Sequence, residues 1–235
     1  MTYTWLDHTP IAADARGFPN RVECPDKRWT EGAIVEQITN AKLYHVTVAA
    51  PYKTALTAGQ ILQVGVAHNP FFGFYESAVA FPVTDHVTGG TIQVKAVDWL
   101  RRVKAGTIMT TPQTLATIAE EVTMHYVILS RELMMEQIRV REFVDAPSRQ
   151  TCIYASDNLA EAKKWNATLG GAGSVCELTC TGTIHVADSR LLLTDSEPLS
   201  VTLDRARQYW RGDISPNPYM ETLFVGDATV TGIGF

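Results

Sequence analysis

The sequence lacks the features that mark membrane and secreted proteins. No stretch approaches the roughly 18 consecutive apolar residues that a helix needs to cross a bilayer. Its first residues have neither the basic segment nor the apolar segment of a signal peptide. We therefore expect a cytoplasmic protein that makes no contact with a membrane.

Cysteine is also scarce, with four in 235 residues. Cys176 and Cys180 lie four apart in a segment that reads as a strand, so their side chains share one face. A zinc site would need a second closely spaced pair of His or Cys residues, and none is present. We expect reduced, buried thiols and no metal site.

The chain has no excess of positive charge. It carries 20 Lys and Arg against 25 Asp and Glu, a formal net charge of −5. Proteins that bind nucleic acids through electrostatic attraction usually neutralise phosphates with clustered Lys and Arg. The charge therefore argues against such a binder, although local basic patches remain open. The candidates are Arg101, Arg102 and Lys104, or Arg139, Arg141 and Arg149.

Several catalytic and nucleotide-binding motifs are missing. There is no Gly-x-Gly-x-x-Gly after a strand and no phosphate-binding loop that ends in Gly-Lys-Ser/Thr. The His-Glu-x-x-His and Gly-x-Ser-x-Gly motifs are absent as well, which disfavours metalloproteases and α/β-hydrolases. The glycine-rich loop 170–173 follows a predicted helix and does not form a dinucleotide motif.

The remaining pattern predicts a single α+β domain over residues 1–235. With 46% hydrophobic and 19% charged residues, the chain can bury an ordinary core. Residues 1–40 show no sustained period and are interpreted as an irregular N-terminal arm. The period of the apolar residues predicts a long helix over 112–141, which starts at Thr111-Pro112 and belongs to a helical insertion over 100–142.

Short apolar segments bounded by turn residues predict the strands. Asn69-Pro70 is expected to open a turn before an aromatic cluster that ends at Glu76. Gly212 is expected to end a late helix. The predicted strands are 41–50, 151–156, 175–180 and 183–186, followed by a hairpin of 221–225 and 228–233 across Gly226-Asp227.

Three polar residues stand out on otherwise apolar strands: His45, Tyr154 and Glu221. Each has an ordinary structural explanation when it is taken alone. A strand histidine usually has a partner or faces solvent, a strand tyrosine usually packs in the core, and a glutamate at a strand start is usually solvated. The residues themselves thus suggest only an α+β domain with a plausible site.

Their order and context resemble the ADP-ribosyltransferase superfamily, in the branch with a His–Tyr–Glu triad shared by diphtheria toxin and the poly(ADP-ribose) polymerases. The first motif is Tyr44-His45-Val46-Thr47. The second is the strand 153–156 that leads into a helix, and the third is Glu221 at the start of an apolar strand. The resemblance implies a split β-sheet core that binds NAD.

The spread of motifs is also similar to that of the rifampin ADP-ribosyltransferases, and closer to a poorly characterised bacterial and phage family of the same fold. That family carries Asn-Pro-Phe-Phe-x-Phe-x-Glu, Pro-Ser-Arg and Tyr-Trp-x-Gly. These motifs stand here at 69–76, 147–149 and 209–212. Together, the resemblances cover about half of the chain.

The resemblance implies a role for each site residue. His45 and Thr47 would hold the adenosine side of NAD, and Tyr154 would stack on nicotinamide beside Ser156. Glu221 would stabilise the positive charge that develops on the ribose. Arg149 would contact a phosphate, or else form an ion pair at the end of a helix; the sequence favours neither.

Two departures from the pattern leave questions open. Val46 replaces the glycine that usually follows the histidine, which would narrow the space for adenosine. Rifampin enzymes place the acidic residue earlier, so Asp188 competes with Glu221 for the third role.

We therefore expect an NAD-dependent mono-ADP-ribosyltransferase that modifies a protein or a nucleic acid. Toxins and phage conflict factors are common in this superfamily, so a neutralising antitoxin or immunity protein is an expected partner by analogy. An NAD glycohydrolase, an RNA 2′-phosphotransferase and a non-catalytic binding module on the same fold are the alternatives. The phosphotransferase would want a basic pocket, which this acidic chain does not suggest.

Overall fold

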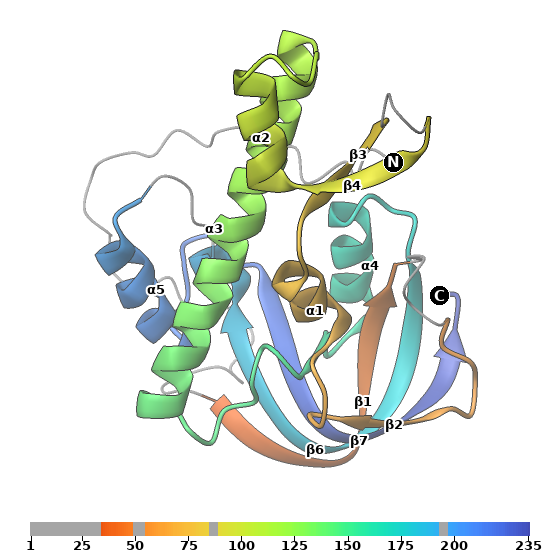
Figure 1. Cartoon of the computed structure of the whole chain (residues 1–235). Helices are drawn as coiled ribbons and strands as arrows, with labels where there is room; N and C mark the ends of the chain where they lie inside the picture. The colour runs from red at the N-terminus through yellow and green to blue at the C-terminus, as the bar shows by residue number, and fades with distance from the viewer. Residues whose placement is uncertain (1–33, 49–54, 85–88, 193–196) are drawn as a thin grey trace.

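The computed structural model describes residues 34–48, 55–84, 89–192 and 197–235. An antiparallel five-stranded sheet forms its body, with helices packed on it, which confirms the α+β class (Figure 1). The strand order is β1-β6-β7-β2, and β5 also pairs with β7. The strands are β1 (Ile34–Thr47), β2 (Ile61–Val64), β5 (Ile153–Ala155), β6 (Ser174–Asp188) and β7 (Met220–Ile233).

The three long strands bend along one line across the sheet, and Figure 1 shows the curve at its base. β1 has an irregular register between Ile38 and Ala41, where Asn40 adopts a positive φ of 51°. Gly182 of β6 lies opposite Gly226 of β7, and both have positive φ angles. A Cβ on Gly182 would stand 2.8 Å from the Gly226 Cα, so the close approach of the two backbones requires glycine.

This bend corrects two of our predictions. The segments around Gly182 and Gly226 were expected to be turns between separate strands, but each lies within one continuous strand. The ladder runs through both glycines, because Thr181 pairs with Asp227 next to them. Glycine in a strand can mark a bend as well as a turn, and here it marks a bend.

The N-terminal prediction also needs correction. Residues 34–40 were assigned to an irregular arm, but they form the first half of β1, which pairs with 182–186 of β6. The sheet gives this segment backbone partners that its own sequence pattern does not reveal. Residues 1–33 lie outside the described part of the chain.

Two helices cover one face of the sheet: α3 (Pro112–Glu142) and α5 (Leu199–Arg211). The long helix α3 confirms the prediction made from the period of its apolar residues, and Thr111 caps it as predicted. Gly212 ends α5 in a left-handed conformation, also as predicted. The core on this face includes Met135, Ile138, Ala187, Ala206, Tyr209, Trp210 and Leu223.

The opposite face of the bent sheet closes over a second core. Residues of β1, β6 and β7 pack there against a residue of β5. The parts of this face on either side of the bend therefore pack on each other. The buried members are Leu43, Ala155, Leu178, Cys180, Ile184, Val186, Phe224, Ala228 and Val230. The helix α4 (Leu159–Thr168) follows β5 and begins at the Asn158 cap, as predicted. A short 3₁₀ turn, η1 (Ser189–Leu192), follows β6.

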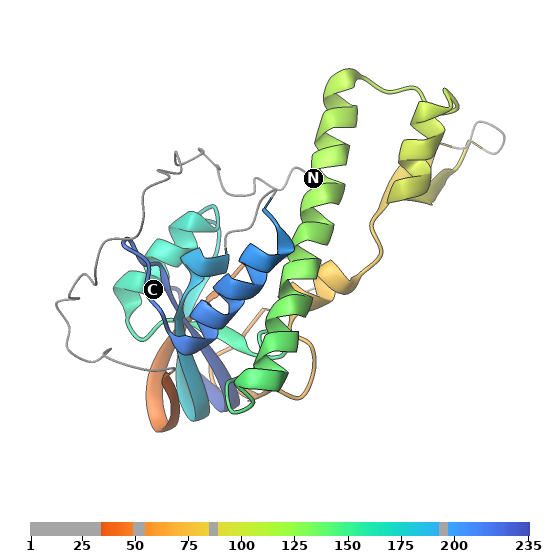
Figure 2. The same cartoon turned by 90° about the vertical axis from the view of Figure 1, so that its left-hand side faces the viewer.

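The segment before α3 forms a projecting arm, seen at the top of Figure 1 and to the right in Figure 2. It consists of the hairpin β3 (Ala80–Thr84) and β4 (Thr91–Lys95), followed by α2 (Ala96–Lys104). The helix α1 (Pro70–Glu76) precedes the arm in the sequence. The predicted turn at Asn69 is in fact the cap of this helix, because the Asn69 side chain accepts the Phe72 N–H. None of the described helices is long and apolar enough to cross a membrane.

Candidate functional site

His45 and Tyr154 meet where β1 and β5 come together. An isolated antiparallel bridge joins Tyr44 to Ser156, with two backbone hydrogen bonds of 2.8 Å. One residue along, the His45 Nδ1 lies 2.8 Å from the carbonyl oxygen of Tyr154. The bridge links the outer strand β1 to β5, so two residues 109 positions apart become neighbours.

Tyr154 and Glu221 share one face of the next strand pair. Tyr154 lies opposite Leu223 in the β5–β7 ladder, and Glu221 is two residues from Leu223 on the same face. Both side chains reach Arg149. Its guanidinium lies 5.0 Å from the centre of the Tyr154 ring, and one of its nitrogens donates to a Glu221 carboxylate oxygen.

Arg149 is the centre of a buried ion-pair network. Its Nε donates to the Glu132 carboxylate of α3 at 2.9 Å, and its Nη1 donates to the Tyr209 hydroxyl of α5 at 2.7 Å. The Tyr209 hydroxyl in turn donates to Glu221 at 2.7 Å. Only 3% of Arg149 and 1% of Glu132 are exposed. The network therefore connects β7, α3, α5 and the segment before β5.

The charges in this network determine the protonation of its members. Burial would raise the pKa of Glu132, but the positive charges and hydrogen bonds of Arg149 and Arg131 outweigh it, and the pKa lies below its usual value. Burial raises the pKa of the Tyr154 and Tyr209 hydroxyls well above the usual range for tyrosine. Both hydroxyls therefore stay protonated at neutral pH and act as donors: that of Tyr154 donates to the Arg149 carbonyl at 2.9 Å.

The three triad candidates do not lie on one face. Alternation along β1 places His45 on the side of Leu43, which packs with Ala155 and Phe224 in the second core. Tyr154 packs on the opposite side, in the core under α3 and α5. His45 thus contacts the backbone of Tyr154, while the side chains of Tyr154 and Glu221 meet around Arg149.

Asp188, the alternative acid, is surrounded by backbone donors. Its Oδ1 accepts the N–H groups of Arg190 at 3.0 Å and Tyr219 at 2.8 Å. Its Oδ2 accepts the Ser215 N–H at 2.8 Å, and the residue is fully buried. In the β6–β7 ladder Asp188 lies opposite Met220, whereas Glu221 lies opposite Ala187, so the two carboxylates point to different faces.

The remaining predicted contacts of NAD lie along the same strand ends. Ser156 is buried and supplies the bridge to Tyr44. Thr47 is at the end of β1, opposite Ser174. Of the two readings of Arg149, the structure contains the ion pair.

The sequence analysis missed Glu132 and gave Tyr209 no role. Glu132 has a detectable signal: it falls on the buried stripe of α3, between His125 and Met135, where the helical period calls for an apolar residue. A charged residue on a buried stripe needs a partner of opposite charge, but the sequence does not say which of the many arginines provides it.

The fold and the site define an α+β domain in which a strand junction lies beside a buried Arg–Glu–Tyr network. The model of a family described as a protein of unknown function (DUF2441) matches residues 43–233. The match covers most of the chain, so the chain belongs to this family. The matched range, residues 43–233, includes all the site residues discussed above. A search of curated proteins found no match.

Proposed function

We propose that this protein binds NAD at the junction of β1 and β5 and transfers its ADP-ribose group to a macromolecule. The observation that carries the proposal is the meeting of the Tyr154 and Glu221 side chains around Arg149, with His45 in contact with the Tyr154 backbone from the other face of the sheet. On this proposal the bent sheet corresponds to the split sheet of the ADP-ribosyltransferases.

The chemistry requires a fixed negative charge next to the scissile bond. As the nicotinamide–ribose bond breaks, positive charge develops on the ribose and nicotinamide leaves as a neutral group. A carboxylate held in place stabilises that charge without rearranging at the moment of reaction. Glu221 meets the requirement of a fixed position, because Arg149 and Tyr209 both bind it. An acceptor nucleophile then bonds to the ribose carbon and gives up its proton.

His45 would help to bind the adenosine side of NAD and would take no part in breaking the bond. Its Nδ1 lies 2.8 Å from the Tyr154 carbonyl oxygen, and this contact fixes the orientation of the imidazole ring at the junction of β1 and β5. Tyr154 is partly buried, with Arg149 over its ring and Phe71 packed edge-on at 5.8 Å. Nicotinamide would pack against the exposed part of this ring.

Glu221 is only 6% exposed, and this sets a condition on the mechanism. For Glu221 to approach the ribose, NAD must displace either Arg149 or Tyr209 from its carboxylate. Arg149 has a second carboxylate partner in Glu132 and can keep it when it releases Glu221. We therefore assign to Glu132 the role of holding Arg149 while Glu221 turns to the substrate.

The binding of the Glu221 carboxylate by Arg149 and Tyr209 also favours a second candidate function, a non-catalytic binding module on the same fold. Both Glu221 and Asp188 have internal partners, as structural carboxylates do. In this case the network only ties the helices to the sheet, and the protein would not break the nicotinamide–ribose bond.

Incubation with NAD labelled in its adenylate half and a cell extract separates these functions. Wild-type protein is expected to move label into protein or nucleic acid, and a Glu221→Gln variant of unchanged fold is not. Asp188→Asn is the carboxylate control, compared where circular dichroism shows it folded: its Oδ1 can still accept the Arg190 and Tyr219 N–H groups, but its amide NH2 cannot accept the Ser215 N–H.

Each outcome has one interpretation. Label that enters a macromolecule only with wild type supports transfer. Free ADP-ribose without a labelled acceptor identifies an NAD glycohydrolase instead. Intact NAD under all conditions rejects both enzymes and leaves the binding module. Loss of transfer in Asp188→Asn but not in Glu221→Gln would move the catalytic role to Asp188.

A further inference from the structure

The projecting arm of the molecule has an internal core of its own and little contact with the sheet. Trp99 of α2 is 4% exposed and packs 5.8 Å from the Phe81 ring of β3. Val94 and Ala96 are buried beside it. In Figures 1 and 2 the arm and the first turns of α3 extend away from the rest of the protein. An element that has its own buried residues and projects from the body presents a surface rather than supporting the core of the sheet.

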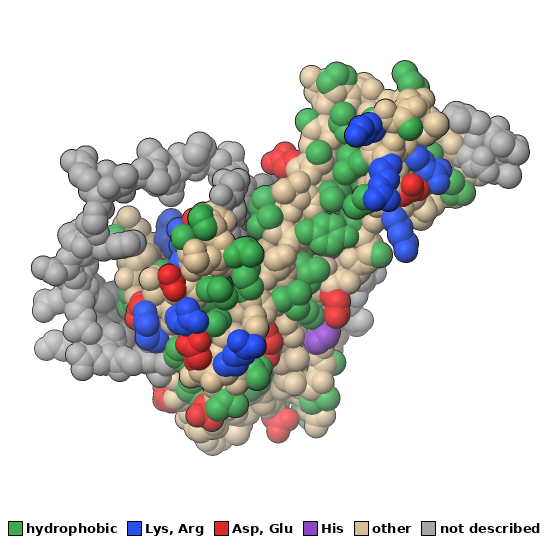
Figure 3. All heavy atoms as spheres, turned by 60° about the vertical axis from the view of Figure 1, so that its left-hand side comes forward, with side chains coloured by type: hydrophobic (Ala, Val, Ile, Leu, Met, Phe, Trp, Pro, Cys, Tyr) green, Lys and Arg blue, Asp and Glu red, His purple; other side chains and the backbone are tan. Residues whose placement is uncertain are grey.

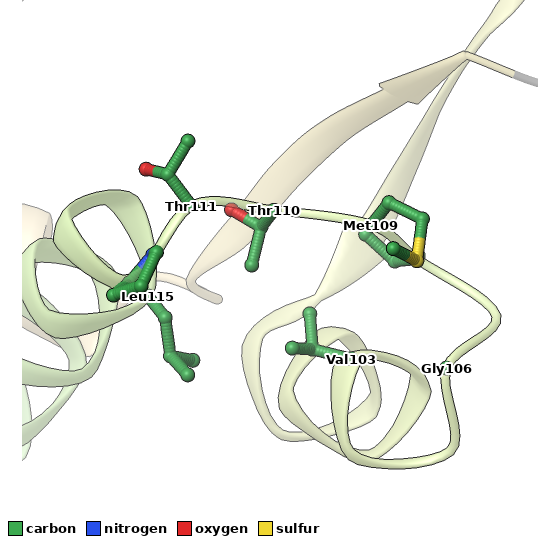
Figure 4. Close-up of a pocket in the computed structure, with 8 residues that line it drawn as sticks. Val103, Gly106, Met109, Thr110, Thr111 and Leu115 are labelled. Carbon is green, nitrogen blue, oxygen red and sulfur yellow. The ribbon is translucent and has the colours of Figure 1, made fainter.

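An apolar hollow of about 260 Å³ lies on the arm, between α2 and the start of α3. Figure 4 shows Val103 on α2, Leu115 on α3 and Met109 on the loop that joins the helices. Met109 is 88% exposed, although it belongs to the residue types that usually pack. Its flexible thioether suits a surface that adapts to a partner.

The size of the hollow decides what kind of ligand it fits. Sites for cofactors and other small molecules usually span about 300–1,000 Å³ and bury most of the ligand. This hollow is smaller, and it is open along the loop 106–112. It has room for one or two apolar side chains that a larger partner inserts.

Basic residues on and next to α2 lie to one side of this hollow and form its basic rim, although the whole chain is acidic. Residues 95–104 contain four basic residues and one acidic residue, a net charge of +3 from 4 − 1. The whole chain has −5, so the remainder has −8. Arg102 pairs with Asp98 at 2.9 Å, whereas Lys95, Arg101 and Lys104 are exposed and form no ion pair in the described part of the chain. Figure 3 shows several blue side chains, with a red one among them, on the arm.

We infer that the arm docks an acidic amphipathic helix of a partner protein, with its apolar side chains in the hollow and its carboxylates on the basic rim. A groove beside two helices is a common receptor for such helices, which insert residues at i, i+3 or i+4, and i+7. A nucleic acid fits less well, because protein–nucleic acid interfaces are more polar than those between proteins, whereas the centre of this surface is apolar. The inference does not depend on the proposed NAD chemistry.

Fluorescence anisotropy with a labelled synthetic helix tests the inference on the full chain. The probe is a peptide of about five helical turns with leucines along one face and glutamates beside them. Two matched peptides replace the glutamates with lysines or the leucines with serines. A labelled RNA of similar length tests the other class of macromolecule.

Three variants locate the binding. Met109→Glu places a negative charge at the hollow and is expected to lower the affinity for the acidic peptide about tenfold or more. Arg101→Glu with Lys104→Glu is expected to weaken it by a similar factor at low salt and less at high salt, because salt screens the rim. Lys163→Glu, an exposed charge reversal on α4 of the body, is the control and is expected to change nothing.

The inference is supported if only the acidic, leucine-bearing peptide binds and the arm variants reduce its affinity. It is overturned if no peptide binds, if the arm variants bind as well as wild type, or if RNA binds more tightly than the acidic peptide. Light scattering during size-exclusion chromatography provides one more test. A dimer that Met109→Glu dissociates would mean that the arm binds a second copy of this chain instead.

Discussion

At the scale of single residues, Arg149 joins three separate elements, α3, α5 and β7. It lies between two buried carboxylates, Glu132 and Glu221, and against two tyrosine rings. Removing one partner of a buried ion pair leaves an unpaired charge in the interior, which costs far more than the pair contributes. Arg149 therefore matters for stability whether or not the protein is an enzyme.

We expect Arg149→Ala to lower the free energy of unfolding by about 3–5 kcal/mol, because two buried carboxylates lose their common cation. Arg149→Lys keeps the charge but not the planar fork and should fall between that variant and wild type. Urea unfolding followed by circular dichroism measures both. The exposed Arg101→Ala is the control, expected within about 0.5 kcal/mol of wild type. An Arg149→Ala loss no larger than that of the control would contradict the network.

His125 provides a residue-scale prediction of pH dependence. Burial lowers its pKa from 6.5, its Nε2 has no hydrogen-bond partner, and its ring packs against Tyr75. The folded protein therefore binds this proton less readily than the unfolded chain, so stability falls as the pH drops through about 6.5. The loss from Glu132, whose pKa lies below 4.5, comes at lower pH.

We expect His125→Phe to flatten the decline of stability between about pH 7 and pH 5, because the variant has no proton to gain there. Denaturation midpoints at several pH values, compared with wild type, measure the difference. Parallel curves for the two proteins would show that His125 does not carry this pH dependence.

At the scale of elements, the main device is the bend shared by β1, β6 and β7. It lets one face of the sheet fold over a core while the other face receives α3 and α5. The sequence predicted that Gly182 and Gly226 interrupt the strands, but it could not distinguish a turn between two strands from a bend within one. That difference depends on which strand pairs across each glycine, which is a long-range property.

We expect Gly226→Ala to destabilise the protein by several kcal/mol, since its Cβ would meet the Thr181 backbone at a positive φ of 135°. Gly59→Ala is the matched control, because Gly59 also has a positive φ but nothing lies near its Cβ. Thermal unfolding compares them. If both variants melt alike, the close approach of the strands is not what requires glycine.

Prediction of elements succeeded where the signal was local. The cap at Thr111, the period of α3 and the stop at Gly212 are all written within a few residues. It failed where neighbours decide, as at residues 34–40, which become a strand because β6 pairs with them. The Asn69 motif is an intermediate case, in which a turn signal turned out to be a helix cap.

At the scale of the whole molecule, the fold brings distant residues together in a way that the sequence only partly predicts. The resemblance to a known order of motifs placed His45, Tyr154 and Glu221 in one site, whereas the structure puts Tyr154 and Glu221 on one face and His45 on the other. Their connection to Glu132 and Tyr209 could not be predicted, because it requires α3 and α5 to pack on that face. On our two proposals, the body would carry the chemistry and the arm would bind a partner protein.

The release of nicotinamide from NAD by the purified protein, with a cell extract present as the source of acceptor, tests the central claim most directly. We predict measurable release by wild type and a loss of about a hundredfold or more in Glu221→Gln, the cost of removing a charge that acts on the transition state. Circular dichroism must show both proteins folded at the assay temperature. Equal release by the two proteins, or none by wild type, would contradict the account.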